Sequence, residues 1–254
     1  MIKYIDTHIH IDSKKFKNCE KALSFISNKL KKNNIEKGIV LHLNWQKWSA
    51  EDFLSTCLKF KTLYGFINID LNKFNEEKLK KLKKNHKLLG IKLHPRFNQS
   101  FRFNHKNFNK LCIICAKLKL PILVCSFFDK ITLKKKIIHQ DFFYLAKNNP
   151  KTKFIFAHLG GYKCMDFLVM AKQLDNVYLD LSFSINYFKN SSIKDQLLFC
   201  CKSLKCNKIF YGSDYPELDL KKSIDMHEKN FLKNFTKSEK NKIFYKNAKK
   251  FFNF

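Results

Sequence analysis

The start of the chain places two histidines two positions apart at the end of an apolar run. The run covers residues 4–10, is predicted to be a short strand, and ends with His8 and His10. Because side chains alternate along a strand, both imidazoles project from the same face. If that face lines the mouth of a closed barrel, their nitrogens can bind one metal ion at about 2.0–2.1 Å. The alternative is a histidine pair on a half-exposed strand, so further ligands must be sought elsewhere in the sequence.

Other apolar runs of the chain also end in polar residues. Lys92 and His94 stand two positions apart in one run, and three further runs end at Cys125, at His158 and just before Asp214. In a barrel of parallel strands, the active site forms where the strands end and the following loops begin. All of these residues would therefore meet at one end of the molecule. Most of them are of types that bind metals.

The apolar runs alternate with amphipathic segments along the whole chain. We predict strands at residues 4–10, 38–43, 63–69, 88–94, 122–125, 153–158, 177–181 and 208–212, and helices at residues 18–32, 50–60, 75–84, 106–118, 133–147, 164–173, 193–203, 220–234 and 238–252. This alternation predicts an α/β fold, a (β/α)8 TIM barrel with an extra C-terminal helix, as a single domain over residues 1–254. A doubly wound open sheet is the alternative, but no glycine-rich phosphate loop follows the first strand.

The composition predicts a folded domain with a strongly basic surface. The chain has 254 residues, of which 45% are hydrophobic, and its formal net charge is +29. Such a charge is typical of proteins that bind nucleic acids or membrane surfaces. The lysines, however, are spread over nearly every predicted helix and accompany abundant Asn, Phe and Ile, as A/T-rich codons would produce. We therefore interpret them as solvated helix faces and expect no nucleic-acid partner, with a functional basic surface as the alternative.

The cysteines and the apolar segments indicate a cytoplasmic protein. Nine cysteines, odd in number and irregularly spaced, do not have the pattern of a disulfide framework. Cys112 and Cys115 fall on the apolar face of a predicted helix without a second pair, which favours core packing over zinc binding. No signal peptide is visible, and no run approaches the roughly 18 apolar residues of a spanning helix. We expect no contact with a membrane.

Five motifs of the chain resemble the amidohydrolase superfamily, and specifically its amidohydrolase-related branch of decarboxylases, lactonases and small hydrolases. They are DTHIH at 6–10, GIKLHP at 90–95, FAHLGG at 156–161, YGSDYP at 211–216 and NAKKFF at 247–252. The resemblance spans the whole chain with the motifs in their usual order. It implies a TIM barrel that binds one divalent metal, most commonly zinc.

The resemblance also implies a role for each matching residue. His8 and His10 would bind the metal, and Asp214 would contact it and act as the general base. His158 would stand beside the metal as a further ligand, to polarise a substrate oxygen or to move a proton. The family carries a ligating histidine where this chain has Cys125. Cys125 would either bind zinc at about 2.3 Å as a thiolate or be a wall residue of a site poor in metal or free of it, or the barrel no longer catalyses.

The residues after the fourth strand indicate the substrate. Lys92 is expected to be a substrate-facing cation, and His94 would bind the substrate or orient Lys92. Arg96 and Arg102 are the only arginines of the chain, and the planar guanidinium of Arg96 suits a carboxylate or phosphate. We therefore expect a small anionic substrate, although an exposed arginine pair on a loop is the alternative.

The predicted function is hydrolysis of an amide, lactone or ester by water that a divalent metal activates. The alternatives are a non-oxidative decarboxylase of the same branch, a metal-independent lactonase and a catalytically inactive barrel. Since barrels of this branch are often dimers, a homodimer is a further expectation.

Overall fold

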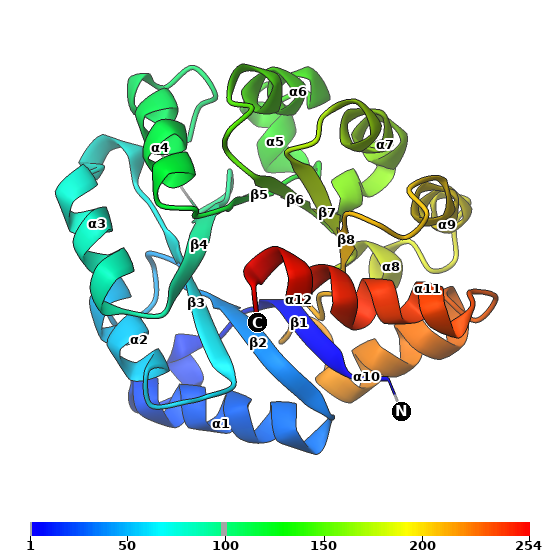
Figure 1. Cartoon of the computed structure of the whole chain (residues 1–254), viewed down its shortest axis with the longest axis horizontal. Coiled ribbons are helices and arrows are strands. Elements are labelled where there is room, and N and C mark those ends of the chain that lie inside the picture. Colours follow the sequence, from blue (N-terminus) through cyan, green and yellow to red (C-terminus); the bar gives the residue numbers. More distant parts are fainter. Residues whose placement is uncertain (1, 98–100) are drawn as a thin grey trace.

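Eight parallel strands form one sheet that curves into a barrel inside a ring of helices (Figure 1). The computed structural model describes residues 2–97 and 101–254. Neighbours in the sheet follow the chain order: β1 (Tyr4–Ile9), β2 (Ile35–Leu41), β3 (Leu63–Asn68), β4 (Leu88–Leu93), β5 (Ile122–Cys125), β6 (Phe154–Ala157), β7 (Val177–Asp180) and β8 (Ile209–Phe210). The prediction of a TIM barrel with an added C-terminal helix is confirmed.

The barrel is closed by the segment that follows β8. Strand β8 has only two residues, fewer than the predicted 208–212. Beyond it, Tyr215 pairs with Ile9 of β1 in an isolated parallel bridge. The Asp214 N–H donates to the His8 carbonyl oxygen at 2.9 Å. These bonds place the residues after the last strand directly beside the end of the first.

Several helices of the ring begin at a polar side chain that caps them. The helices are α1 (Cys19–Lys32), α2 (Ala50–Cys57), α3 (Glu76–Asn85), α4 (Lys106–Lys117), α5 (Lys130–Lys134), α6 (His139–Asn148), α7 (Cys164–Gln173), α8 (Ser184–Tyr187), α9 (Ile193–Ser203), α10 (Leu220–Asp225), α11 (Lys237–Asn241) and α12 (Asn247–Phe252). Ser49 caps α2 and exchanges hydrogen bonds with Asp52, which completes a capping box. Asn18 accepts from the Lys21 N–H at 2.9 Å at the start of α1.

Three predicted helices are divided or irregular in the structure. Residues 133–147 form the end of α5 and most of α6, because Lys136 adopts a left-handed φ of 53° and Asp141 starts a new helix by accepting from the Ile138 N–H. The predicted helix 220–234 continues from α10 into a π-helical turn, η4 (Met226–Phe231), and α11 and α12 are joined by a second one, η5 (Lys242–Lys246). Amphipathic spacing does not reveal such local changes of winding.

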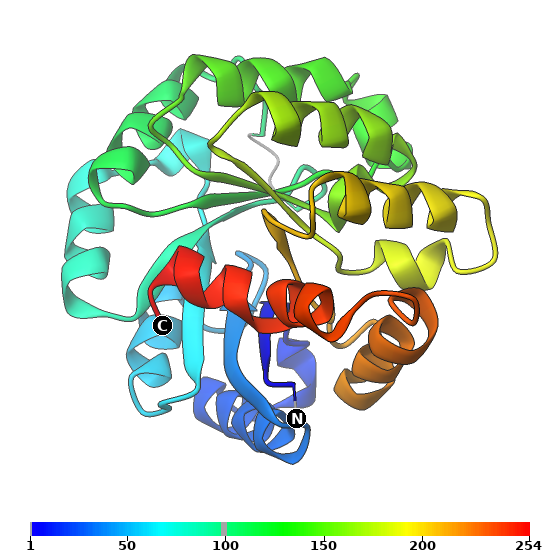
Figure 2. The same cartoon turned by 45° about the vertical axis from the view of Figure 1, so that its right-hand side comes forward.

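Apolar side chains fill the barrel and are covered at one end by the last helix. The inner cluster contains Ile5, Ile39, Leu41, Phe66, Leu123, Ile155 and Phe210, together with Ala248 and Phe252 of α12. The Phe251 ring lies 4.4 Å from the ring of Tyr178, near the start of β7. The last helices therefore lie along the amino-terminal end of the strands (Figure 2). The side chains that could do chemistry lie at the carboxyl end.

All nine cysteines are buried and free of disulfide bonds. Within the described chain, no helix has both the length and the apolar character that crossing a membrane requires.

The η4 turn buries a histidine that the site does not use. His227 is 1% exposed, and its Nδ1 lies 2.8 Å from the Ser223 carbonyl oxygen. Its ring lies 5.1 Å from the ring of Tyr211, almost perpendicular to it. Burial lowers the pKa of His227 to about 4. The folded protein therefore keeps this imidazole neutral over a pH range in which the unfolded chain protonates it.

This difference predicts part of the pH dependence of stability. The stability that the neutral His227 contributes is fully present above its unfolded pKa of about 6.5 and is lost as the pH falls towards about 4. When the pH is lowered from 7 to 4.5, we expect the free energy of unfolding to fall by roughly 2 kcal/mol less in His227→Phe than in the unsubstituted protein. Urea unfolding at the two pH values measures this, and equal losses in both proteins would contradict it.

Candidate functional site

Three side chains from the first and last strands bring potential metal ligands together. His8 Nε2 lies 3.2 Å from His10 Nε2 and 3.4 Å from Asp214 Oδ1. His10 Nε2 lies 3.7 Å from the same carboxylate oxygen. A tetrahedral zinc ion with bonds of 2.0–2.1 Å holds its ligand atoms about 3.3 Å apart. The spacing of the three atoms suits one divalent metal ion.

The backbone around His8, His10 and Asp214 allows the ends of the first and last strands to come close together. A Cβ atom built on Gly212 would stand 2.7 Å from the Cβ of His8, so only glycine allows the last strand to pass this close. Asp214 adopts a φ of 56°, which non-glycine residues seldom occupy. Asp6 supports the turn, because its Oδ1 accepts from the N–H groups of His8 at 3.1 Å and Ser213 at 3.0 Å. Burial raises the pKa of Asp6 to about 6.

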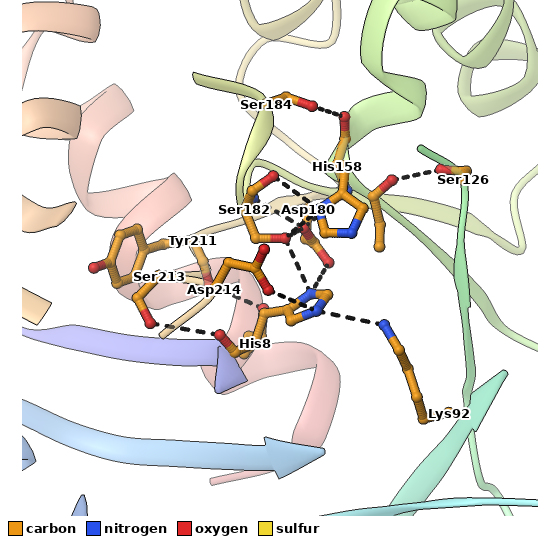
Figure 3. A network of polar contacts seen from close by, with 12 residues as sticks. His8, Lys92, Ser126, His158, Asp180, Ser182, Ser184, Tyr211, Ser213 and Asp214 are labelled. Atoms are coloured by element: carbon orange, nitrogen blue, oxygen red, sulfur yellow. Dashed lines mark hydrogen bonds and ion pairs between the residues drawn. The ribbon is translucent and has the colours of Figure 1, made fainter. Parts of the chain in front are cut away.

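The other edge of the His8 ring contacts a buried carboxylate. His8 Nδ1 lies 3.0 Å from Asp180 Oδ2, at the end of β7 (Figure 3). Both side chains are fully buried. A carboxylate can only accept, so Nδ1 carries the hydrogen and Nε2 keeps its lone pair for a metal. Burial alone would raise the pKa of Asp180, but the neighbouring His8 holds it well below its usual range.

Ser182 links this pair to His158. The Ser182 hydroxyl donates to Asp180 and lies 3.0 Å from Nδ1 of both His8 and His158. His158 Nδ1 also lies 3.0 Å from the Ser182 carbonyl oxygen, and its backbone N–H donates to Asp180 Oδ1 at 3.1 Å. His158 is held at a left-handed φ of 62° in the turn that follows β6. Figure 3 shows Asp180 and Ser182 in contact with both His8 and His158.

A second group of possible ligands consists of His8, His158 and Asp180. It shares His8 with the first group, but the His8–Asp180 contact uses Nδ1 rather than Nε2. The hydrogen bonds through Ser182 account for this second group without an ion. The set of His8, His10 and Asp214 is therefore the stronger candidate for the metal.

The predicted substrate cations are placed differently from each other. Lys92 is fully buried, and its Nζ lies 3.4 Å from His8 Nε2. Burial lowers the pKa of Lys92. Arg96 is half exposed and pairs through one terminal nitrogen with Asp129, the residue that caps α5. Arg96 therefore reaches the solvent side of the site, whereas Lys92 lies behind the histidines.

A cavity of about 350 Å³ opens beside these groups. It is lined by His10, His94, Arg96, Phe97, Cys125, Phe127, Asp129, His158, Phe183, Tyr187, Asp214 and Glu217. Burial lowers the pKa of His158 to about 4 and holds the pKa values of His10 and His94 well below the usual range. These histidines are therefore neutral near pH 7 and can bind metal or accept a proton.

Cys125 is a wall residue of this cavity. It is 4% exposed, and burial raises the pKa of its thiol. Its sulfur belongs to neither group of converging ligand atoms found among the described residues. The ligand role of Cys125 stays a prediction.

Asp180 and Ser182 belong to the candidate site by their contacts, and sequence reasoning missed both. Asp180 ends β7, so the rule that selected the other strand ends applies to it equally. Ser182 is a polar residue two positions after Asp180, but its place in the site depends on contacts with His8 of β1 and with His158, which follows β6. Those contacts could be found only from the structure.

Comparison with known proteins relates the chain to one family. Residues 45–254 match the family model described as amidohydrolase. This range includes His94, Cys125, His158 and Asp214, while His8 and His10 precede it. No curated protein matches the sequence.

Solved structures share the fold over their full length. A probable 2-pyrone-4,6-dicarboxylic acid hydrolase from Acinetobacter baumannii, with citric acid bound, has 16% identity and a TM-score of 0.73, with all of both chains covered. An amidohydrolase from Burkholderia multivorans with bound zinc has 11% identity and a TM-score of 0.70 over 99% of each chain. A 5-carboxyvanillate decarboxylase from Sphingomonas paucimobilis has 10% identity and a TM-score of 0.68, covering 100% of this chain and 99% of the other.

The contact between Asp180 and His8 predicts how strongly the site holds metal. Replacing Asp180 by Asn removes the charge that fixes the protonated nitrogen of His8. We expect Asp180→Asn to bind zinc about 10–100-fold more weakly, as is usual when such a partner is lost. Competition with a fluorescent chelator measures the affinity, and circular dichroism shows that the variant is folded. The exposed Asp175 provides a control, and equal affinities of Asp180→Asn and Asp175→Asn would refute the role of Asp180.

Proposed function

The chain belongs to the amidohydrolase family, and we propose that it is a metal-dependent hydrolase of a small amide, lactone or ester. The observation that carries this proposal is the convergence of His8 Nε2, His10 Nε2 and Asp214 Oδ1 within 3.2–3.7 Å of one another beside the cavity. Two imidazoles and a carboxylate are ligands that zinc accepts at such spacing. The membership of the chain in a family of metal-binding enzymes supports the same interpretation.

The residues of the site divide the chemical work between them. A divalent metal, zinc in our proposal, would supply Lewis acidity, which polarises the scissile carbonyl group and makes water more acidic. Asp214 would accept the proton of the attacking water. His158 donates its Nδ1–H towards the Ser182 carbonyl oxygen, so its Nε2 keeps a lone pair. His158 can therefore take a proton from Asp214 and pass it to the leaving nitrogen or oxygen.

An anionic substrate group would bind on the side of Arg96. Among the residues that the structure describes, one nitrogen of this guanidinium is paired with Asp129, and the five N–H donors of a guanidinium also suit a carboxylate of the substrate. His94 lines the same part of the cavity, and Phe97 packs between His94 and Arg96. Glu217 also lines the cavity, so the uncharged part of the substrate would lie towards it.

Replacement of Asp214 tests the proposed reaction. We expect the zinc-loaded protein to hydrolyse members of a panel of small carboxylated amides, lactones and esters. Asp214→Asn removes the proton acceptor, and its rate should fall roughly 10²–10⁴-fold. Asp175→Asn is the control, because Asp175 is fully exposed and is not among the residues that line the cavity. If the protein releases carbon dioxide from aromatic acids and hydrolyses no member of the panel, its reaction is decarboxylation and not hydrolysis.

Metal content separates the possible roles of Cys125. Because its sulfur stands outside both converging groups, we expect Cys125→Ala to retain the zinc of the unsubstituted protein. His10→Ala should lose most of it, since His10 supplies one of three ligands. Elemental analysis of proteins purified without added metal measures both. Loss of zinc from Cys125→Ala would make Cys125 a ligand, and a metal-free but active protein would favour a metal-independent lactonase.

A further inference from the structure

A local hydrogen bond fixes which ring nitrogen of His94 carries the hydrogen. His94 follows β4 and lines the cavity of about 350 Å³. Its Nδ1 accepts a hydrogen bond from the backbone N–H of Arg96 at 3.2 Å. Burial, together with the nearby Lys92 and His10, holds the pKa of His94 well below its usual range, so the ring is neutral near pH 7. A neutral imidazole carries one hydrogen, and because Nδ1 accepts, that hydrogen is on Nε2.

The Nε2–H group of His94 is accessible to a molecule in the cavity. Within the described chain, the one hydrogen bond of the His94 ring is the bond at Nδ1, so Nε2 has no partner. The buried side-chain nitrogen and oxygen atoms that lack a partner among the described residues do not include Nε2 of His94. A nitrogen that is neither paired nor buried is exposed, and His94 is part of the cavity wall. This ring therefore offers an unused hydrogen-bond donor.

His158 offers the opposite group to the same cavity. Its Nδ1 lies 3.0 Å from the Ser182 carbonyl oxygen, which can only accept, so its Nε2 carries a lone pair. Two more nitrogen-bearing side chains belong to the described wall: His10, a proposed metal ligand, and Arg96, on the solvent side. Among the imidazoles of this described wall, His94 is therefore the neutral donor and His158 is a neutral acceptor.

The size of the cavity brings one bound molecule to both His94 and Asp214. A volume of about 350 Å³ is at the lower end of the range for small-molecule sites, so it suits a single small substrate. Both residues line it. A substrate whose carbonyl carbon receives water beside Asp214 thus lies within the same small space as the free N–H group of His94.

We propose that His94 Nε2–H donates to the carbonyl oxygen that becomes negatively charged in hydrolysis, which makes His94 a catalytic residue. This inference rests on the proposed function. When water adds to the carbonyl carbon, an electron pair of the C=O double bond moves to the oxygen, and a donor that is already in place stabilises that charge. His94 keeps its hydrogen throughout, because the proton that moves is the one that Asp214 accepts from water.

Two amide substitutions separate this role from a structural one. The side-chain oxygen of Asn can accept from a backbone N–H two residues on, as His94 Nδ1 does, but its amide nitrogen does not reach the position of Nε2. The longer Gln can place its amide nitrogen there. A donor role predicts that His94→Gln stays within about tenfold of the unsubstituted kcat, whereas His94→Asn loses roughly 10²–10³-fold, the usual effect of removing one such donor. A role in holding the Arg96 backbone predicts the reverse order.

Steady-state kinetics of the zinc-loaded protein measures both variants on the panel member that the unsubstituted protein hydrolyses fastest. The loss in His94→Asn should fall on kcat with KM nearly unchanged, because the charge on the oxygen exists only in the transition state. His139→Asn is the control, since His139 begins α6 and is not among the residues that line the cavity. Circular dichroism shows that the variants are folded. Unchanged kcat in both His94 variants, or a greater loss in His94→Gln than in His94→Asn, would overturn the proposal.

The hydrogen on Nε2 can be measured without any substrate. Long-range ¹⁵N–¹H correlation spectra of the full-length protein distinguish the two neutral forms of each imidazole, and the signals missing from His94→Gln identify His94. His42, whose Nε2 donates to the Trp48 carbonyl oxygen, and His158 provide references for the two forms. A hydrogen on Nδ1 of His94 would overturn the proposal even in an active enzyme. An inactive unsubstituted protein with the hydrogen on Nε2 would instead refute the proposed hydrolysis, and with it the catalytic role, while the donor itself would stand.

Discussion

The geometry of the site depends on one buried carboxylate. Asp180 accepts hydrogen bonds from the His8 ring, from the backbone N–H groups of His158 and Ser182, and from the Ser182 hydroxyl. These partners belong to β1, to the turn after β6 and to the segment after β7. A fully buried negative charge is tolerated only when it is paired and hydrogen-bonded. The same bonds that satisfy Asp180 therefore fix two imidazoles in one arrangement.

Burial gives the site an electrostatic character unlike that of the surface. The chain carries a net charge of +29, mostly on exposed lysines, whereas the histidines around the cavity are kept neutral by desolvation. Neutral imidazoles can bind a metal ion, which protonated ones cannot. The fully buried Lys92 lies beside the candidate metal site, with its Nζ 3.4 Å from His8 Nε2. Burial lowers the pKa of this amine, and the carboxylates Asp180 and Asp214 act in the opposite direction.

Much of this architecture could be predicted from the sequence, because apolar periodicity and polar strand ends are local signals. These signals predict the eight strands and the position of His8, His10 and Asp214 at one end of the barrel. Contacts between distant segments have no local signal, which is why Asp180, Ser182 and the pairing of Arg96 with Asp129 were not foreseen. The division of helix 133–147 at Lys136 depends on one backbone angle. The anionic substrate, the homodimer, the absence of a nucleic-acid partner and the cytoplasmic location stay predictions.

The closure of the barrel has a consequence for biosynthesis. His8 is synthesised well before Asp214 and the segment that pairs with β1, which lie at the other end of the barrel's strand order. Domains generally fold as units during or after synthesis. The nascent chain therefore carries the histidine pair without its carboxylate partner until that later segment has been made. Binding of the proposed metal by all three ligands would therefore require that the segment after the last strand has docked on the first.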